Sequence, residues 1–402
     1  MKYIVILGDG MADLPIDAIG GKTPLQVANK PYMDKFAKMG VMGKVKTVYD
    51  GLSPGSDVAN LCVMGFDTSK NYTGRSPLEA ASIGVSLTDT DITYRANLVT
   101  LSDEADYDKK TMLDYSAGEI SSEEAKELIE SIQKELGNDI FSFYSGVSYR
   151  HLLLRKDLKK AGALIPPHDI AERKIFEYLP KDEAILSLMV KSHEILKNHP
   201  VNIKRISEGK NPANSVWIWG EGTKPQLENY KEKFGISGSV ISAVDLIKGI
   251  AILSGLKSID VKGATGTVHT NFKGKAEAAI EALKSGDDFL YVHLEAADES
   301  GHQGSLSDKI KSIELIDEMI IKPIYEYLLK EKEEFAMLVL PDHPTPIALK
   351  THTREPVPFV LIKNTDSEIK NDFNYCEEDS EKTGIFIEKG HTLMYNIINN
   401  KM

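Results

Sequence analysis

The first ten residues, MKYIVILGDG, place Asp9 in a glycine-flanked turn at the end of a short apolar strand, residues 2–7 (KYIVIL). Two later apolar stretches end in the same way: residues 289–294 (FLYVHL), followed by Asp298 and His302, and residues 335–340 (FAMLVL), followed by Asp342, His343 and His352. In open α/β sheets, functional groups gather at the carboxyl ends of the strands. Three strands that each lead into carboxylates or imidazoles therefore predict one assembled site.

Length and composition indicate a two-domain globular protein. The chain has 402 residues, beyond the roughly 250–300 at which a single hydrophobic core stops growing. Its apolar fraction of 42% suits a full core. No apolar run approaches the roughly 20 residues of a membrane helix, and the N-terminus lacks the long apolar region of a signal peptide. We therefore expect no membrane partner.

The number of cysteines indicates the cellular compartment, and the net charge limits the classes of partner. Cys62 and Cys376 are too few for a disulfide framework, which with the missing signal predicts a cytoplasmic protein. A net charge of −12 argues against a nucleic-acid partner. It is compatible with a small anionic substrate, because a divalent metal supplies local positive charge. The sequence carries no signal for an oligomeric state.

Alternating strand and helix patterns predict an α/β fold with a mostly parallel sheet flanked by helices. Residues 113–190 contain none of the three ligand-bearing strands. We expect them to form a smaller inserted α+β domain that acts as a substrate-binding lid, and residues 1–112 and 191–402 to form the core. Residues 215–219 (SVWIW) are expected to be a strand of that core.

Two segments of the expected insertion have clear local signals. Ser121 and Glu124 have the spacing of a capping box at the start of a helix over residues 121–136. Residues 141–154 (FSFYSGVSYRHLLL) predict a hairpin. The glycine-rich residues 263–267 (GATGT) predict a turn, since no Walker or dinucleotide-binding pattern surrounds them.

The ligand types at the three strand ends suit a divalent metal such as Mn²⁺ or Zn²⁺, and no thiolate cluster is present. Asp298 and His302 are four residues apart, so they share one side of a helical turn. Three carboxylates and three imidazoles are too many for one ion with an open position. They suit two ions about 3.5–4 Å apart, an arrangement that clamps the attacking and leaving oxygens of phosphoryl transfer.

Such a site needs a nucleophile, and Ser56 in residues 52–61 (LSPGSDVANL) is the best candidate. Pro54 and Gly55 predict a tight turn, and a helix is expected to begin after it, with Ser56 or Asp57 near its N-cap. The positive end of the helix and coordination to a metal ion would both favour the ionised hydroxyl.

Several longer motifs resemble the cofactor-independent phosphoglycerate mutases of the archaeal type, within the alkaline-phosphatase superfamily. They are ILGDGMAD (6–13), GLSPGSDVANL (51–61), YTGRSPLEAA (72–81), EAADESGHQG (295–304) and PDHPTPIALKTHTREPVPF (341–359). The resemblance covers nearly the whole chain. It implies an alkaline-phosphatase-like core and interconversion of 3- and 2-phosphoglycerate, in glycolysis and gluconeogenesis, without 2,3-bisphosphoglycerate.

The resemblance also implies a ligand set. One metal ion would be held by Asp9, Ser56, Asp342 and His343, and the other by Asp298, His302 and His352. Ser56 would be the residue that is transiently phosphorylated. Mn²⁺ is the expected metal at both positions, with Zn²⁺, Mg²⁺ or Co²⁺ as alternatives.

One segment departs from the family pattern. Residues 211–220 (NPANSVWIWG) carry Trp217 and Trp219 where the archaeal mutases have an arginine-bearing stretch. The WIWG form resembles a bacterial branch with a proposed homoserine-kinase role. A related phosphotransferase or a phosphomonoesterase is therefore the alternative to a mutase. The two tryptophans are expected to pack rather than to stack on a cofactor.

A phosphorylated substrate with a carboxylate needs cationic groups in addition to the metals. Arginine binds either anion bidentately, so Arg150 is the first candidate, and the adjacent His151 is a candidate with it. Arg75 and Lys224 follow. His293 lies inside a predicted strand and is expected to be a core residue or a supporting residue behind the metal ligands.

Overall fold

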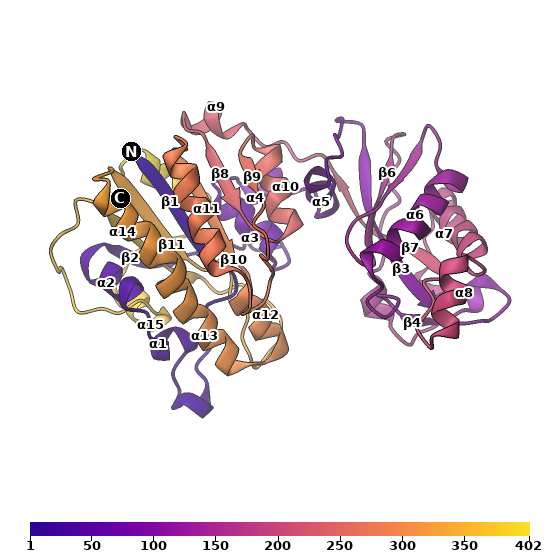
Figure 1. Ribbon diagram of the computed structural model, residues 1–402, viewed down its shortest axis with the longest axis horizontal. Coiled ribbons are helices and arrows are strands. Elements are labelled where there is room, and N and C mark those ends of the chain that lie inside the picture. Colours follow the sequence, from indigo (N-terminus) through magenta and orange to yellow (C-terminus); the bar gives the residue numbers. More distant parts are fainter. The chain divides into compact units, whose positions relative to one another are not determined.

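The computed structural model describes all residues from 1 to 402 and divides them into two compact units. The larger consists of residues 1–72 and 226–402, and the smaller of residues 73–225. Figure 1 shows a sheet flanked by helices in the larger unit and a separate sheet with its own helices in the smaller. The expected α/β fold class, with a large and mostly parallel sheet flanked by helices, is confirmed.

The larger unit is built on one eight-stranded sheet. Its strands are β1 (Lys2–Gly8), β2 (Val41–Val45), β8 (Gly238–Ile241), β9 (Lys257–Ile259), β10 (Phe289–Leu294), β11 (Phe335–Leu340), β12 (Val357–Lys363) and β13 (Phe386–Ile387). Their order is β13-β2-β12-β11-β1-β10-β8-β9, and only β12 pairs antiparallel with its neighbours. The central strands are buried on both faces, as their continuous apolar runs predict for a mostly parallel sheet.

Helices cover both faces of this sheet. On one face α2 (Pro31–Met39), α11 (Phe272–Lys284) and α14 (Lys322–Lys330) pack on alternate strand residues such as Ile6 and Val292. On the other face lie α3 (Ser56–Val63), α10 (Asp245–Leu253) and α16 (Thr392–Ile398). There Tyr291 of β10 donates to Asn60 of α3 at 2.6 Å, and Tyr3 of β1 donates to the carbonyl of Ile398.

The remaining helices of the larger unit are short or lie at its edges. They are η1 (Asp17–Ile19), α1 (Pro24–Val27), α4 (Thr68–Asn71), α9 (Tyr230–Phe234), α12 (Ala296–Gln303), α13 (Leu306–Ile316), the π-helix η5 (Asp317–Ile321) and α15 (Glu377–Lys382). Of these, α12 follows β10 directly and carries Asp298 and His302.

The smaller unit is an antiparallel sheet with helices on it. Its elements are α5 (Ser76–Ser82), β3 (Ile92–Leu101), η2 (Tyr107–Lys109), β4 (Met112–Asp114), α6 (Ser122–Leu136), β5 (Phe141–Tyr144), β6 (Arg150–Arg155), η3 (Pro167–Ile170), η4 (Phe176–Tyr178), α7 (Glu183–Leu196), α8 (Pro200–Ser207) and β7 (Ser215–Thr223). The predicted hairpin is β5–β6, and the predicted helix is α6, capped by Ser121.

The smaller unit is wider than the 113–190 segment expected from the sequence. Its central strand is β3, which pairs antiparallel with β6 on one side and with β7 on the other. The expectation that residues 215–219 are a strand of the core is therefore wrong. Those residues have an ordinary buried-strand pattern, which does not show which sheet the strand joins.

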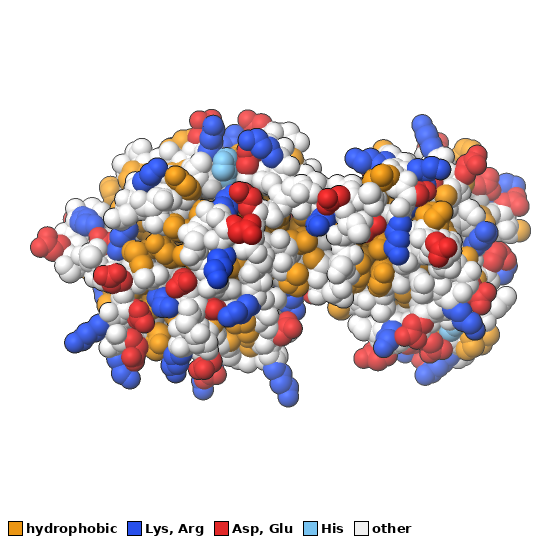
Figure 2. All heavy atoms as spheres, turned by 90° about the horizontal axis from the view of Figure 1, so that it is seen from above, with side chains coloured by type: hydrophobic (Ala, Val, Ile, Leu, Met, Phe, Trp, Pro, Cys, Tyr) orange, Lys and Arg blue, Asp and Glu red, His pale blue; other side chains and the backbone are white.

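No helix in the structure combines the length and the apolar character needed to cross a bilayer. Acidic and basic side chains are interspersed on the face seen in Figure 2, with apolar side chains between them. That face therefore presents no broad patch of one charge.

Candidate metal centre and nucleophile

The parallel pairing of β1 with β10 and β11 brings the three predicted strand ends to one edge of the sheet. Leu7 lies opposite His293 of β10 and Leu340 of β11, so the residues that follow each strand are neighbours. The Asp9 amide donates to the carbonyl of Leu294 at 2.9 Å. Asp9, Asp298 and Asp342, which are distant in sequence, are therefore assembled in one place, as the sequence predicts.

One group of potential metal ligands consists of Asp9, Asp342 and His343, whose ligand atoms all lie within 4.8 Å of one another. His343 Nε2 is 3.6 Å from Asp9 Oδ1 and 3.4 Å from Asp342 Oδ2. All three side chains are buried. Asp342 is held by the Asn60 amide at 2.8 Å and by the Gly10 backbone at 3.2 Å.

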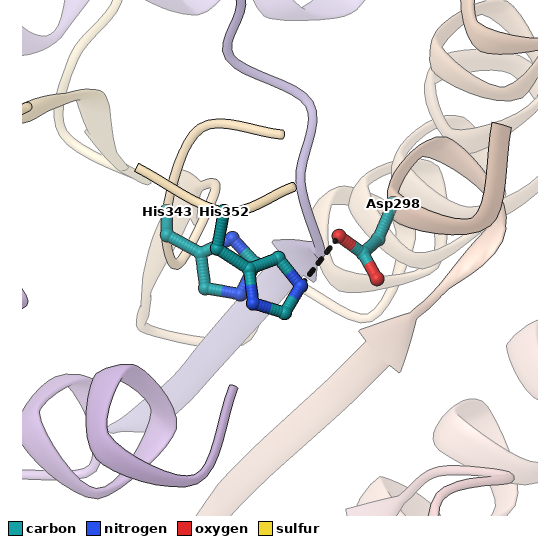
Figure 3. Close-up of side chains that lie close together, drawn as sticks. All are labelled: Asp298, His343 and His352. Atoms are coloured by element: carbon teal, nitrogen blue, oxygen red, sulfur yellow. Dashed lines mark ion pairs between the residues drawn. The ribbon is translucent and has the colours of Figure 1, made fainter. Parts of the chain in front are cut away.

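The second group lies beside the first and shares His343 with it. Asp298, His343 and His352 again place their ligand atoms within 4.8 Å, and Figure 3 shows the two imidazoles and the carboxylate turned toward one another. His302 Nε2 is 3.3 Å from Asp298 Oδ2 and 2.9 Å from His352 Nε2. His302 Nδ1 faces the carbonyl of Lys350, which leaves Nε2 for a metal.

The electrostatics of both groups fit divalent cations. Burial, followed by the charges of Asp342 and Asp298, raises the pKa of Asp9 well above its usual range. Its buried Oδ1 has no hydrogen-bond partner. Hydrogen bonds to His302 and His352 outweigh burial and hold the pKa of Asp298 well below its usual range. Buried carboxylates with converging imidazole nitrogens are a typical donor set for a metal.

Ser56 is the first residue of α3, and its hydroxyl faces the first group. The Ser56 Oγ donates to Asp9 Oδ2 at 3.3 Å and lies 3.2 Å from His343 Nε2. The N-cap is Gly55 rather than Ser56 or Asp57, and the Ser56 side chain makes no capping hydrogen bond. Its oxygen is therefore available for chemistry at the positive end of the helix.

Gly10 is required by the close approach of two loops. It has a φ of +65°, and a Cβ there would lie 2.6 Å from the Asp298 Cα and 2.7 Å from Thr345 Oγ1. Gly10→Ala should lower the free energy of unfolding by about 1–3 kcal/mol and weaken Mn²⁺ binding, because Asp298 must move. Thermal unfolding and Mn²⁺ titration measure the two effects.

The matched control for this substitution is Gly21→Ala. Gly21 also has a positive φ, of +72°, but a Cβ there would meet no atom within 4 Å. It should therefore show the backbone strain without the loss of Mn²⁺ binding. Equal Mn²⁺ affinity in both variants would contradict the packing argument.

Several residues that support the site were not predicted from the sequence. Lys309, fully buried on α13, donates to the carbonyls of Ala12 and Thr345 and to Asp13, and so ties together the loops after β1 and β11. Thr345 in turn donates to Asp298. The sequence gave no sign that Lys309 would be buried. Lysine is common in amphipathic helices, and the loops that bury this one are distant in the chain.

The four predicted substrate-binding residues all lie in the smaller unit. Arg150 begins β6, is exposed, and places its guanidinium 5.1 Å from the Tyr149 ring. Arg75 pairs with Glu79 at 2.9 Å, and Lys224 pairs with Asp89 at 3.6 Å.

His151 differs from the other three candidates because it is buried. Its Nδ1 accepts from the Gly146 amide, and burial lowers its pKa to about 3. These contacts favour a structural role in the β5–β6 hairpin.

The two tryptophans of the unusual WIWG segment have different surroundings. Trp217 is buried, and its indole donates to the carbonyl of Ile165, which confirms the predicted packing role. Trp219 is half-buried, donates to Asn97 at 3.0 Å and lies 4.3 Å from the Arg95 guanidinium. The second tryptophan therefore orients an arginine.

The family model described as 2,3-bisphosphoglycerate-independent phosphoglycerate mutase matches residues 37–202. A relative of that name from Methanosarcina barkeri is 49% identical over 100% of both chains. The chain belongs to this family. Another member, described as probable, from Geobacter sulfurreducens, is 49% identical over 98% of each chain.

Solved structures agree with the family assignment at the level of the fold. A protein from Pyrococcus horikoshii has a TM-score of 0.83 at 28% identity, covering 100% of this chain and 98% of its own. A cofactor-independent phosphoglycerate mutase from Thermoplasma acidophilum has a TM-score of 0.67 at 24% identity, with the same coverage. The family that the sequence motifs predicted is therefore confirmed.

Proposed function

We propose that this protein interconverts 3-phosphoglycerate and 2-phosphoglycerate without 2,3-bisphosphoglycerate, by way of phosphorylated Ser56. The observation that carries the proposal is the position of the Ser56 hydroxyl, within 3.3 Å of both Asp9 and His343 in a cluster of buried potential metal ligands. The names of the close relatives support the same reaction. We infer a role in glycolysis and gluconeogenesis.

Two divalent ions would complete the site, with Mn²⁺ as the first choice. Asp9, Ser56, Asp342 and His343 would hold one, and Asp298, His302 and His352 the other. When bound, the ions would lower the pKa of the Ser56 hydroxyl and neutralise charge on the transferred phosphoryl group.

The chain's own residues would carry the transfer. The ionised Ser56 oxygen attacks the phosphorus of 3-phosphoglycerate, forming the Oγ–P bond as the bond to the 3-oxygen of glycerate breaks and that oxygen takes a proton. The 2-hydroxyl of the retained glycerate then attacks phosphorylated Ser56, loses its proton and restores the free serine. A mutase must therefore keep glycerate in place and exclude water between the two steps.

We assign the retention of glycerate to the smaller unit, as a lid that supplies cationic groups. Arg150 is the best candidate, since it is exposed and forms no ion pair. Arg150→Ala should raise the KM for 3-phosphoglycerate roughly 10- to 100-fold, the effect of losing a hydrogen bond to a charged group. Steady-state kinetics with saturating Mn²⁺ measure this change.

Arg173→Ala is the control, because Arg173 is an exposed arginine of the same unit that bonds to Tyr178. It should leave the KM unchanged. A wild-type KM in the Arg150→Ala variant would show that Arg150 does not bind the substrate. It would not affect the assignment of Ser56.

The alternative activities differ from the mutase in their products. Purified protein with Mn²⁺ and 3-phosphoglycerate should produce 2-phosphoglycerate, which phosphorus NMR resolves from its isomer. Release of inorganic phosphate instead would indicate a phosphomonoesterase, and formation of phosphohomoserine from homoserine and ATP would indicate a kinase. Either result without 2-phosphoglycerate contradicts the proposal.

We further propose a cytoplasmic location. Cys62 and Cys376 are both buried free thiols, and burial raises the pKa of each. Unpaired cysteines suit a reducing compartment such as the cytoplasm.

A further inference from the structure

A chain of alternating charges runs from α11 through the interior to Asp9. Lys275 on α11 is fully buried, and its Nζ lies 3.0 Å from Glu295 Oε2 and 2.8 Å from the His293 carbonyl oxygen. Glu295 follows β10 and lies 3.0 Å from His293 Nδ1. His293 Nε2 is then 3.2 Å from Asp9 Oδ2. The chain thus connects a lysine on a covering helix to a predicted metal ligand.

Glu295 is held as an anion by donors on every side. Besides Lys275 and His293, it accepts from the Ser242 hydroxyl at 3.1 Å and from the Ala243 backbone at 3.0 Å. Burial alone would raise its pKa, but the charge of Lys275 and the bond from His293 lower it to about 2. A carboxylate with this many donors stays charged in the interior.

His293 is enclosed by two carboxylates, one at each ring nitrogen. Its Nδ1 faces Glu295 Oε1 at 3.0 Å and Ser242 Oγ at 3.2 Å, and its Nε2 faces Asp9 Oδ2 at 3.2 Å. Neither group of potential metal ligands includes His293. The imidazole is therefore placed to orient Asp9 rather than to hold a cation itself.

The two carboxylate oxygens of Asp9 have different surroundings. Asp9 Oδ2 faces His293 and also accepts from Ser56 at 3.3 Å. Asp9 Oδ1 is buried without a hydrogen-bond partner and faces His343 Nε2 at 3.6 Å. Fixing Oδ2 thus leaves Oδ1 turned toward the place where a cation would be held by Asp9, Asp342 and His343.

Stability alone does not explain these buried charges. Burying an ion pair is costly, and well-packed apolar residues of similar volume are often as stable or more stable. Residues that hydrogen-bond to metal ligands, by contrast, change metal affinity by roughly 10- to 100-fold when they are replaced. A functional role is therefore the better explanation of these buried charges.

We propose that Lys275, Glu295 and His293 form a positioning relay that sets the cation affinity of the Asp9, Asp342 and His343 group. The relay acts through Asp9 and touches neither substrate nor the reacting atoms. The inference rests on the metal centre of the proposed function, and it adds residues to which that function assigns no part.

The test is an Mn²⁺ titration of metal-free protein, followed by the electron paramagnetic resonance signal of free Mn²⁺. Glu295→Gln keeps the shape of the side chain but removes its charge. One of the two ions should then bind roughly 10- to 100-fold more weakly while the other is unchanged. Lys275→Met should weaken the same ion. The Mn²⁺ concentration for half-maximal activity should rise by the same factor, with the KM for 3-phosphoglycerate unchanged.

The controls lie on the exposed face of α11. Glu277 and Lys273 form an exposed pair at 3.6 Å. Glu277→Gln and Lys273→Met therefore make the same two kinds of substitution on the solvent side of the helix that carries Lys275. Both should bind two Mn²⁺ ions as the wild type does. If Glu295→Gln and Lys275→Met also bind both ions with wild-type affinity, the relay is contradicted.

A milder variant covers the case in which Glu295→Gln does not fold. Ser242→Ala removes one donor to Glu295, together with the contact of the same hydroxyl with His293 Nδ1 at 3.2 Å, and keeps the charges of Lys275, Glu295 and Asp9. It should weaken one ion several-fold, as the loss of such a hydrogen bond predicts. Wild-type affinity for both ions in that variant would overturn the relay. A wild-type chain that binds no Mn²⁺ would instead contradict the metal centre itself.

Discussion

Ser56→Ala should lower the mutase rate by roughly 10⁴-fold or more, because removal of a nucleophile that forms a covalent intermediate leaves only binding and electrostatic effects. The Ser56 hydroxyl is the only one that the structure places against both Asp9 and His343. The rate is measured by the appearance of 2-phosphoglycerate. Mass spectrometry after brief exposure of the wild type to 3-phosphoglycerate should show a phosphate on Ser56.

Ser53→Ala provides the matched control, since Ser53 lies in the same loop but is exposed. It should keep wild-type activity and should still be phosphorylated only on Ser56. A Ser56→Ala enzyme that retains a substantial rate would rule out the phosphoserine route. A phosphate found on another residue would identify that residue as the nucleophile and would not contradict the other assignments in the site.

Removal of divalent cations should produce a second large loss, of at least about 1000-fold, since metal ions supply several kcal/mol of transition-state stabilisation in such sites. The chelated protein should regain activity when Mn²⁺ is added. Without cations, Asp9 and Asp342 are two acidic groups buried together, and burial and their mutual repulsion raise the pKa of Asp9. Calorimetry should show two Mn²⁺ ions per chain.

His352→Ala separates the two cation positions. It removes an imidazole 3.3 Å from Asp298 and leaves Asp9, Asp342 and Ser56 untouched. The variant should bind one Mn²⁺ tightly instead of two. His269→Ala, which removes an exposed loop histidine, should bind two. Activity that survives thorough chelation would contradict the metal-dependent mechanism altogether.

Much of the candidate site could be predicted because the candidate metal ligands come after strands that can be recognised from their apolar sequence. Apolar runs such as residues 335–340 can only be buried, and Asp342 and His343 come directly after this one. Parallel pairing then brings such ends together without any long-range information. The supporting residues gave no comparable signal: Lys275 and Lys309 are ordinary helix residues in the sequence, and only the packing of distant segments buries them.

The boundary of the smaller unit shows the same limit at the level of the fold. The pattern of residues 215–219 is that of a strand, and in the structure these residues begin β7, which continues to Thr223. Its partner, β3, precedes it by more than a hundred residues, and an apolar pattern is equally suited to either sheet. The sequence therefore predicted the strand and not its neighbour.

By itself, the sequence determined the α/β class, the family, and which acidic and imidazole residues meet at one edge of the sheet, because local apolar periodicity and the turns after strands depend on nearby residues. Only the tertiary structure decided that His293 stands between two carboxylates, that Lys275 balances them, and that Arg150 lies exposed while His151 is buried. These features arise from contacts between segments far apart in the chain, whose distances and burial no local pattern encodes.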